Sequence, residues 1–289
     1  MIDAASMIGT HDVLLVTLDT LRYDVAASAL AAERTPNLAK VLPGGMWERR
    51  HSPGSFTYAA HQAFFAGFLP TPIAPGRHDR LFAGRFAGSE TTGPRTAVFD
   101  SADIVSGLAA RGYRTICIGG VGFFNKLTPL GRVLPGLFDE SHWSAQLGVT
   151  DPRSTENQVR LARRILGLLP RERRVFLFVN VSALHQPNCI FSPGCTVDTP
   201  QTQAAALAYA DGWLGTLFDA LRRRGPALCV VCSDHGTAYG EEGYVGHRVA
   251  HPVVWEVPYA EFMLEADDTC DEAIASAVTA GIAIEGGHP

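Results

Sequence analysis

An aspartate and a histidine stand side by side directly after an apolar run of strand length in the last quarter of the chain. Asp234 and His235 follow the run at residues 228–231, and a Gly–Glu pair and then His247 come next. A buried strand that ends in such a pair presents a carboxylate and an imidazole together at one edge of a sheet. Because both groups are common ligands of divalent transition metals, the pair predicts a metal site.

The elements that must position this pair are expected from an alternation of short apolar runs with helix-like stretches. Runs that are apolar throughout are typical of strands buried on both faces, as in a parallel sheet flanked by helices. We expect strands at residues 13–18, 115–118, 175–179 and 228–232, further strand candidates at 96–99 and 259–264, and helices at 103–111 and 201–224. Because the sequence shows no repeat and no low-complexity linker, residues 1–289 are expected to form a single α/β domain.

Polar side chains follow several of these expected strands. The first strand is followed by Asp19 and the third by Asn180, with His185 shortly beyond. An aspartate at the end of a strand is by itself commonly a turn or cap residue. In parallel α/β sheets, however, ligands bind at the carboxyl ends of the strands. We therefore expect these acids and histidines to gather with Asp234 and His235 at one edge of the sheet.

The composition argues against several classes of partner. With a formal net charge of −5 the chain gives no reason to expect nucleic acid or an anionic membrane as partner. Its apolar runs are far shorter than the ~20 residues that cross a bilayer, and its first residues lack the pattern of a signal peptide. We therefore expect a cytoplasmic protein. The sequence leaves the oligomeric state open.

Two basic runs interrupt this mildly acidic chain. They lie at residues 171–174 and 222–224, each after a helix-like stretch and just before an expected strand. Positive side chains are favoured at the C-terminal ends of helices, because they oppose the partial negative charge there. We therefore interpret both runs as helix-end residues.

Four short segments, in a fixed order along the chain, carry a family resemblance. They lie at residues 18–24, 35–38, 57–70 and 233–236. Together they resemble the alkaline phosphatase and sulfatase superfamily of metal-dependent hydrolases. In sulfatases a nucleophile is followed by x-Pro-Ser-Arg and later by Thr-Gly-Arg-x-Pro. Here Thr57 falls on the nucleophile position, and Gly67 and Pro70 fall on the later glycine and proline.

The resemblance extends beyond these segments. Residues 234–247 are similar to the corresponding stretch of phosphoethanolamine transferases, and the whole chain resembles a family of short cytosolic sulfatase-like hydrolases of undefined substrate. The resemblance implies an α/β fold of the alkaline phosphatase type, a three-layer sandwich with a mostly parallel central sheet.

A metal site is also implied by the resemblance. One divalent ion would be bound by Asp19, Thr57, Asp234 and His235. Zinc or manganese suits a set with an imidazole better than calcium does. Coordination favours the alkoxide of Thr57, which would attack the phosphorus or sulfur atom in line. His185 and His247 would then hold the non-bridging oxygens or protonate the leaving group.

Departures from the family pattern narrow the range of reactions that we expect of the site. Position 57 holds threonine, not the cysteine or serine that sulfatases oxidise to formylglycine, which argues against the usual sulfatase route. The chain contains only two lysines, Lys40 and Lys126, so the lysines that hold sulfate in sulfatases are missing. The two-metal phosphatases add an Asp-x-x-x-His pair, but Val181 stands four residues before His185. A site for one ion is the more economical interpretation.

Several other residues remain candidates for the site. Ser55 is the alternative nucleophile, and Arg22 and Asp24 are expected to brace the loop after Asp19. The glycine-rich stretch at 119–122 fits an ordinary tight turn better than an anion cradle, because it lacks the full dinucleotide pattern. Specificity is expected to reside in residues 74–94 and 121–135. Candidate substrate contacts are His61, Asn125, Lys126 and His251, although His61 is equally well explained as a packed histidine.

These observations predict a metal-dependent hydrolase that cleaves a phosphoester on a small molecule or a peptide, through a covalent intermediate on Thr57. A cytosolic transferase that moves a phosphoethanolamine-like group onto an acceptor is the first alternative. The others are a sulfatase-like hydrolase and a non-catalytic protein that keeps the site as a metal-stabilised binding surface. One fold can support all of these functions.

Overall fold

A computed structural model describes residues 2–67, 80–82, 96–98 and 103–267 of the chain. Of the expected specificity segments, 121–135 is described, whereas 74–94 lies outside the described residues except for 80–82. Pro70, one of the residues that carry the family resemblance, also lies outside them.

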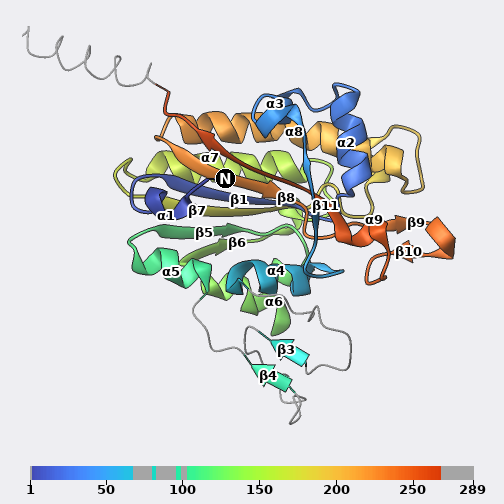
Figure 1. Cartoon of the computed structure of the whole chain (residues 1–289), viewed down its shortest axis with the longest axis horizontal. Helices are drawn as coiled ribbons and strands as arrows, with labels where there is room; N and C mark the ends of the chain where they lie inside the picture. Colours follow the sequence, from blue (N-terminus) through green and yellow to red (C-terminus); the bar gives the residue numbers. More distant parts are fainter. Residues whose placement is uncertain (1, 68–79, 83–95, 99–102, 268–289) are drawn as a thin grey trace, which may run out of the picture.

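The centre of the molecule is a seven-stranded sheet (Figure 1). Its strands lie in the order β2 (Glu48–His51), β11 (Glu256–Leu264), β8 (Ala227–Cys232), β1 (Asp12–Leu18), β7 (Val175–Val181), β5 (Arg114–Ile118) and β6 (Glu140–His142). The pairs from β8 to β6 are parallel, whereas β11 runs antiparallel to both of its neighbours. The sheet is therefore mostly parallel, as the family resemblance implies.

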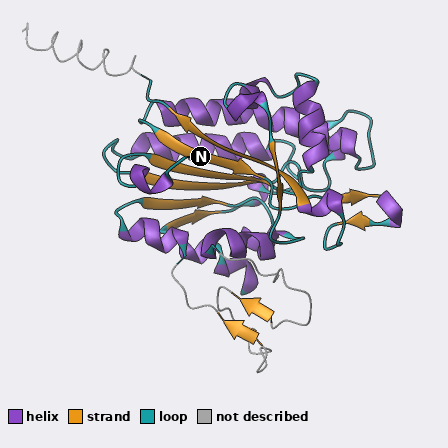
Figure 2. Ribbon diagram, viewed as in Figure 1, coloured by secondary structure: helices purple, strands orange, loops and turns teal. Residues whose placement is uncertain are grey.

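Helices cover both faces of this sheet and make it the middle layer of three (Figure 2). One face carries α2 (Tyr23–Ala31), α3 (Pro36–Ala39), α7 (Ser154–Leu168) and α8 (Pro200–Arg222); the other carries α4 (Thr57–Ala66), α5 (Ile104–Ala110) and α6 (Leu130–Val133). Other short elements include α1 (Ala4–Met7), α9 (Pro252–Trp255), β9 (Ala238–Tyr239) and β10 (Val245–Gly246). The expected three-layer α/β sandwich with a mostly parallel central sheet is thus confirmed.

The uninterrupted apolar pattern of the central strands follows from this three-layer arrangement. Successive side chains of a strand point to opposite faces. In β7, Leu177 and Val179 belong to the core under α7 and α8, while Phe176 and Phe178 belong to the core under α4 and α5. Because both faces are covered by helices, neither set of side chains reaches water. Apart from Asn180, the strand is therefore apolar at every position rather than at every second one.

The two expected helices are present at nearly the expected positions. The helix expected at 103–111 is α5, whose first turn is capped by the carboxylate of Asp103. The helix expected at 201–224 is α8, which begins with a capping box between Thr199 and Thr202. These caps satisfy amide groups that have no partner inside the helix.

The strand at 96–98 differs from its expected place. These residues form β4 (Thr96–Val98), which pairs with β3 (Arg80–Phe82) in a separate two-stranded sheet instead of joining the central one. The edge strands of the central sheet, β2 and β6, were not expected from the sequence. β2 consists of polar, exposed residues, because a strand at the edge of a sheet can satisfy its backbone with one neighbour and keep its side chains in water.

Among the described residues, no helix combines the length and the apolar character that a membrane span requires.

Candidate metal centre and nucleophile

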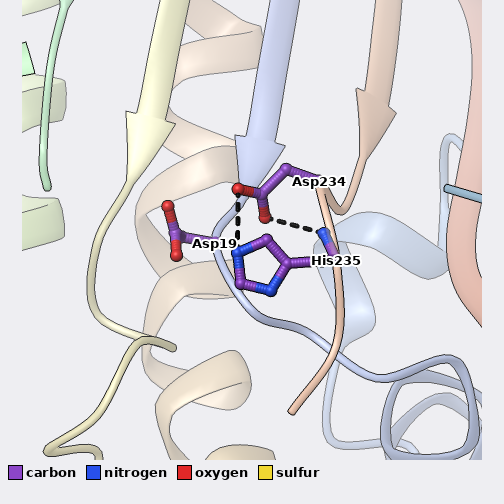
Figure 3. A group of neighbouring side chains, drawn as sticks. All are labelled: Asp19, Asp234 and His235. Carbon is purple, nitrogen blue, oxygen red and sulfur yellow. Dashed lines mark hydrogen bonds and ion pairs between the residues drawn. The ribbon is translucent and has the colours of Figure 1, made fainter. Parts of the chain in front are cut away.

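The parallel strand ends bring three metal-ligating side chains together. Asp19 directly follows β1, and Asp234 and His235 follow the neighbouring strand β8 (Figure 3). All three are fully buried, and one ligand atom from each lies within 4.8 Å of the others. The structure therefore places these sequence-predicted ligands in one cluster at the carboxyl edge of the sheet.

Each of the two carboxylates has one oxygen that is satisfied and one that is not. Asp234 Oδ1 accepts hydrogen bonds from the backbone amides of Thr20, at 3.1 Å, and His235, at 3.0 Å. Asp19 Oδ2 accepts a hydrogen bond from Asn180 Nδ2 at 3.0 Å. Within the described residues, the other oxygens, Asp19 Oδ1 and Asp234 Oδ2, are buried without a hydrogen-bond donor. Buried polar atoms are rarely left without a hydrogen-bond partner, and a cation between these two oxygens would satisfy both.

The pKa values of these two carboxylates also favour a bound cation. Burial, together with the negative charge of Asp234, raises the pKa of Asp19 to about 6. Burial also raises the pKa of Asp234, to about 7. Two buried acids so close together cannot both stay charged at low cost. A divalent cation would favour the ionised form of both groups, so the residues present fit such an ion.

The hydrogen bonding of His235 prepares this side chain as a ligand. Its Nδ1 lies 2.8 Å from the carbonyl oxygen of Gly236. A carbonyl oxygen only accepts, so Nδ1 carries the proton and Nε2 keeps its lone pair. Burial lowers the pKa of His235, which favours the neutral ring. A side-chain Cβ at Gly236 would lie 1.9 Å from the carbonyl oxygen of Val253, so only glycine fits beside the ligand.

Thr57 stands at the first position of helix α4, next to this ligand set. Its Oγ1 lies 3.3 Å from His235 Nε2, and the residue is buried. The N-terminus of a helix favours negative charge, because its first amides have no partner inside the helix. The hydroxyl therefore lies where an alkoxide or a bound anion is favoured. The alternative nucleophile, Ser55, lies before the helix, and its carbonyl oxygen accepts a hydrogen bond of 2.8 Å from the amide of Arg248.

His61 has a different place from the one expected of a substrate contact. It is fully buried, its Nδ1 donates to the carbonyl oxygen of Thr57 at 2.7 Å, and its Nε2 accepts from Thr17 Oγ1 at 3.0 Å. Burial among aromatic rings lowers the pKa of His61 to about 3, so the ring is neutral. With both ring nitrogens in use, His61 has none left for a substrate. Of the two interpretations of His61, the structure favours the packed histidine over the substrate contact, and its hydrogen bond supports the backbone of Thr57.

Asn180 is a site residue whose role the sequence did not reveal. Its Nδ2 donates both to Asp19 Oδ2 and to Thr17 Oγ1, the latter at 3.1 Å. One chain of hydrogen bonds thus joins the metal-ligand candidate Asp19 to His61 and Thr57. The sequence signal was an asparagine in an otherwise apolar strand, where a buried amide needs partners.

The glycine-rich stretch at 119–122 is also held by Asn180. The amides of Gly120 and Val121 donate to Asn180 Oδ1 at 3.3 and 3.1 Å. A Cβ at Gly120 would lie 2.4 Å from the carbonyl oxygen of Asn180. These two amides therefore position Asn180, and the interpretation as a tight turn suits the stretch better than that of an anion cradle.

Two further histidines lie beside the cluster. The ring of His247 is 4.8 Å from that of His235 and 5.9 Å from that of His185, measured between centroids. His185 Nδ1 donates to the carbonyl oxygen of Gln186 at 2.7 Å, so the other ring nitrogen, Nε2, takes no part in this hydrogen bond. Burial, together with the neighbouring histidines and Arg248, lowers the pKa of His247 to about 4. The structure therefore brings His185 and His247 next to the ligand set, as expected.

The other candidate substrate contacts hydrogen-bond within their own surroundings. Asn125 Oδ1 accepts from the amide of Leu127, and Lys126 Nζ donates to the carbonyl oxygen of Ser141. His251 Nδ1 accepts from the amide of Val253 and caps helix α9. These bonds explain the three side chains as structural groups, and their role as substrate contacts stays a prediction.

The loop after β1 is strained and firmly held. Thr20 has a φ of +63°, a left-handed conformation that is costly for a β-branched residue. Its Oγ1 donates to the carbonyl oxygen of Leu184, and its own carbonyl oxygen accepts from Gln203. This conformation aims the Thr20 amide at Asp234 Oδ1. Arg22 braces the same loop through ion pairs with Asp24 and Glu241.

Sequence comparison assigns the family. Residues 11–260 match the sequence model of the sulfatase family. The chain belongs to the sulfatase family. No curated protein sequence matches it.

Solved structures with the same fold include transferases and a sulfatase-like protein. The soluble domain of lipooligosaccharide phosphoethanolamine transferase A from Neisseria meningitidis is 15% identical, with a TM-score of 0.59 over 89% of this chain and 77% of that one. The C-terminal periplasmic domain of EcEptC from Escherichia coli, in complex with Zn, is 14% identical, with a TM-score of 0.58 over 91% and 75%. The putative sulfatase yidJ from Bacteroides fragilis is 14% identical, with a TM-score of 0.57 over 87% and 67%. At these identities the likeness establishes the fold of this sulfatase-family chain.

Proposed function

We propose that this sulfatase-family chain is a metal-dependent enzyme that cleaves a phosphoester, with Thr57 as its covalent nucleophile. The observation that carries the proposal is the position of the Thr57 hydroxyl. It lies 3.3 Å from His235 Nε2, at the start of a helix and beside two buried carboxylates that each lack a hydrogen-bond donor on one oxygen. A hydroxyl serves as a nucleophile at neutral pH only when its surroundings favour the alkoxide.

The four residues that would hold the ion are Asp19, Thr57, Asp234 and His235. A bound zinc or manganese ion would supply Lewis acidity, which favours the ionised hydroxyl and offsets charge that develops on the phosphoryl oxygens. The chain contributes the orientation. The amides of Thr20 and His235 fix Asp234, and the carbonyl oxygen of Gly236 fixes the tautomer of His235.

The reaction of the chain's own groups has two steps. Thr57 Oγ1 gives up its proton and forms a bond to phosphorus while the bond from phosphorus to the alcohol oxygen breaks, and the departing oxygen takes up a proton. Water then gives up a proton as it attacks phosphorus, the bond from phosphorus to Oγ1 breaks, and Oγ1 takes up a proton again. His185 and His247 lie beside the ligand set and are the groups we assign to the phosphoryl oxygens or to proton delivery.

We prefer a phosphoester to a sulfate ester because of the nucleophile itself. A formylglycine forms from cysteine or serine, and a threonine at position 57 does not provide it. A small-molecule or peptide-borne phosphoester is therefore the substrate class we propose.

Transfer of a phosphoryl-linked group to an acceptor alcohol is the second candidate. It is favoured by the structural likeness to phosphoethanolamine transferases, which recurs among the similar structures. The first step would be the same, and an acceptor alcohol would replace water in the second. Product analysis with and without an added alcohol separates the two candidates.

Replacing Thr57 with alanine tests the nucleophile. We expect Thr57→Ala to abolish turnover of aryl phosphomonoesters and phosphodiesters by the zinc- or manganese-loaded protein, because no other group forms the covalent bond. Thr57→Ser keeps a hydroxyl and should retain measurable turnover, while Ser55→Ala is the matched control and should behave as wild type. The assay is release of the aryl alcohol, with intact-protein mass spectrometry of quenched reactions to detect the phosphoryl-enzyme.

Two outcomes would contradict the proposal. Undiminished turnover in Thr57→Ala would remove the nucleophile, and its loss in Ser55→Ala would move the role to that serine. If the wild type turns over no phosphoester with either metal yet binds phosphate analogues tightly, the chain is a binding protein. Turnover of aryl sulfates alone would reinstate the sulfatase alternative.

A further inference from the structure

An arginine-rich groove lies away from the metal centre. Its lining combines apolar residues of α7 and α8 with the six arginines Arg160, Arg163, Arg164, Arg171, Arg223 and Arg224, and it encloses about 630 Å³. No aspartate or glutamate is among the lining residues within the described part of the chain. In a chain whose net charge is −5, such a concentration of positive charge is not expected from composition.

One of these arginines has a structural role that uses all three nitrogens of its guanidinium group. Arg224 is buried, and its Nε donates to Asp12 Oδ2 at 3.0 Å. Its two terminal nitrogens donate to four carbonyl oxygens, those of Leu166, Leu169, Pro170 and Arg173. It thereby satisfies carbonyl groups at and beyond the C-terminal end of α7, which have no partner inside the helix. The expectation that basic residues serve the helix ends is thus met by this residue.

Three other arginines have no such task. Arg163, Arg164 and Arg223 are exposed, and within the described residues their guanidinium groups make neither an ion pair nor a hydrogen bond. By contrast, Arg160 at the same groove pairs with Glu156 at 2.9 Å. Arg160 and Arg164 are four residues apart on α7, a spacing at which like charges repel. An anion bound between them would relieve this repulsion.

The chemistry of the groove selects the kind of anion. A guanidinium group presents a planar fork of donors that matches phosphate, and several such forks around one concave space suit a ligand with several phosphate groups. A concave groove of this size suits a small anion better than a flat membrane surface does. We propose that this groove binds a small polyphosphate-bearing anion, such as a nucleotide or an inorganic polyphosphate.

The groove is separate from the catalytic site. α7 leads into β7 and α8 leads into β8, so the C-terminal ends of both helices lie at the starts of these strands (Figure 1). Asp19, Asp234 and His235 lie at the opposite, carboxyl edge of the sheet. β7 has seven residues, and at about 3.3 Å per residue the two edges are roughly 20 Å apart. A small anion in the groove therefore does not reach Thr57.

Binding of inorganic tripolyphosphate to the metal-loaded full chain tests the proposal by calorimetry. We expect saturable binding by the wild type and an affinity about 10- to 100-fold lower in the triple variant Arg163→Gln, Arg164→Gln, Arg223→Gln, since each change removes one charge contact with the anion. The matched control is Arg49→Gln, Arg111→Gln, Arg153→Gln, which removes the same charge from exposed positions outside the groove. The control should retain wild-type affinity within about twofold, because distant charges are screened by salt.

A second measurement does not depend on variants. Phenylglyoxal modifies accessible arginines, and peptide mass spectrometry locates the products. Tripolyphosphate should protect Arg163, Arg164 and Arg223 of the wild type and leave Arg111 and Arg153 reactive. Equal protection at all five positions would overturn the proposal.

Other outcomes also overturn it. These are the absence of saturable binding by the wild type, an equal loss of affinity in the groove and control variants, and a loss of affinity in Asp234→Ala instead, which would place the anion at the metal centre. Binding to phosphatidylglycerol vesicles without binding to tripolyphosphate would make the groove a membrane contact. None of these outcomes bears on Thr57→Ala, so the groove and the proposed catalytic function fail independently.

Discussion

Two buried aspartates bracket the central strand β1, and their surroundings differ. Asp12 stands at its first position and Asp19 just after its last, and both are fully buried. Asp12 Oδ1 accepts from the amide of Val175 at 2.9 Å, and its Oδ2 accepts from Arg224 at 3.0 Å. Asp19 has only the hydrogen bond from Asn180 on one oxygen, while the other oxygen has no donor among the described residues.

This difference separates a structural acid from a functional one. Around Asp12 the fold itself provides a positive charge, so the carboxylate needs nothing from outside. Around Asp19 the fold provides a second acid, Asp234, and the imidazole of His235, whose neutral form burial favours, instead of an arginine, so the charge of the two acids lacks a permanent counter-charge. Burying charge without compensation costs several kcal/mol. A fold keeps such an unfavourable arrangement where a bound ligand, here a cation, compensates the buried charge.

A substitution at Asp19 is the most direct test of the difference between the structural and the functional acid. We expect Asp19→Asn, which keeps the size of the side chain, to lose bound metal and to lower turnover by about 10³-fold or more, because the site loses a ligand and with it the charge of the ion. The metal-free variant should be at least as stable as the metal-free wild type, since one uncompensated buried charge is gone. Elemental analysis, steady-state turnover and urea unfolding measure the three effects. Full metal content in Asp19→Asn would contradict the ligand assignment.

The opposite result is expected at Asp12. Asp12→Ala leaves Arg224 buried without its counter-charge, and breaking a buried pair in this way costs about 3–5 kcal/mol of unfolding free energy. The metal content per folded chain should not change. The matched control is Asp219→Ala, which removes an exposed carboxylate from the partly exposed Arg222, and it should cost about 0–1 kcal/mol. Urea unfolding measures the loss of unfolding free energy in both variants. An equal loss in Asp12→Ala and Asp219→Ala would show that Asp12 is not the structural acid.

The smallest of the three effects is expected at Asn180, which sharpens the comparison. Asn180→Ala removes the hydrogen bonds that orient Asp19 and Thr17 but leaves every candidate ligand in place. Losing such a supporting partner lowers metal affinity by about 10- to 100-fold. Asn157→Ala, which removes an amide that donates to the carbonyl oxygen of Gln146, serves as control. Competition with a zinc-binding dye measures both variants, and unchanged affinity in Asn180→Ala would remove its orienting role.

Much of the fold was accessible from local patterns. The strands β1, β5, β7, β8 and β11 were expected from their runs of apolar residues, which are typical of strands between two helical layers. β2 was missed, since its exposed polar residues carry no such pattern. β4 was expected as a strand, but its pairing with β3 depends on a partner that apolar composition does not identify.

The candidate site divides in the same way. The sequence by itself indicated that Asp19, Asp234 and His235 follow strands and gather at one edge of the sheet, and with the family resemblance it pointed to Thr57. Only the tertiary structure decided the role of His61, which is bonded to Thr17 forty-four positions earlier in the chain, and the role of Asn180 between Thr17 and Asp19. The physical reason is that strand position follows from local hydrophobic pattern, whereas the charge, tautomer and partners of a buried polar group depend on neighbours that only folding brings within hydrogen-bond distance.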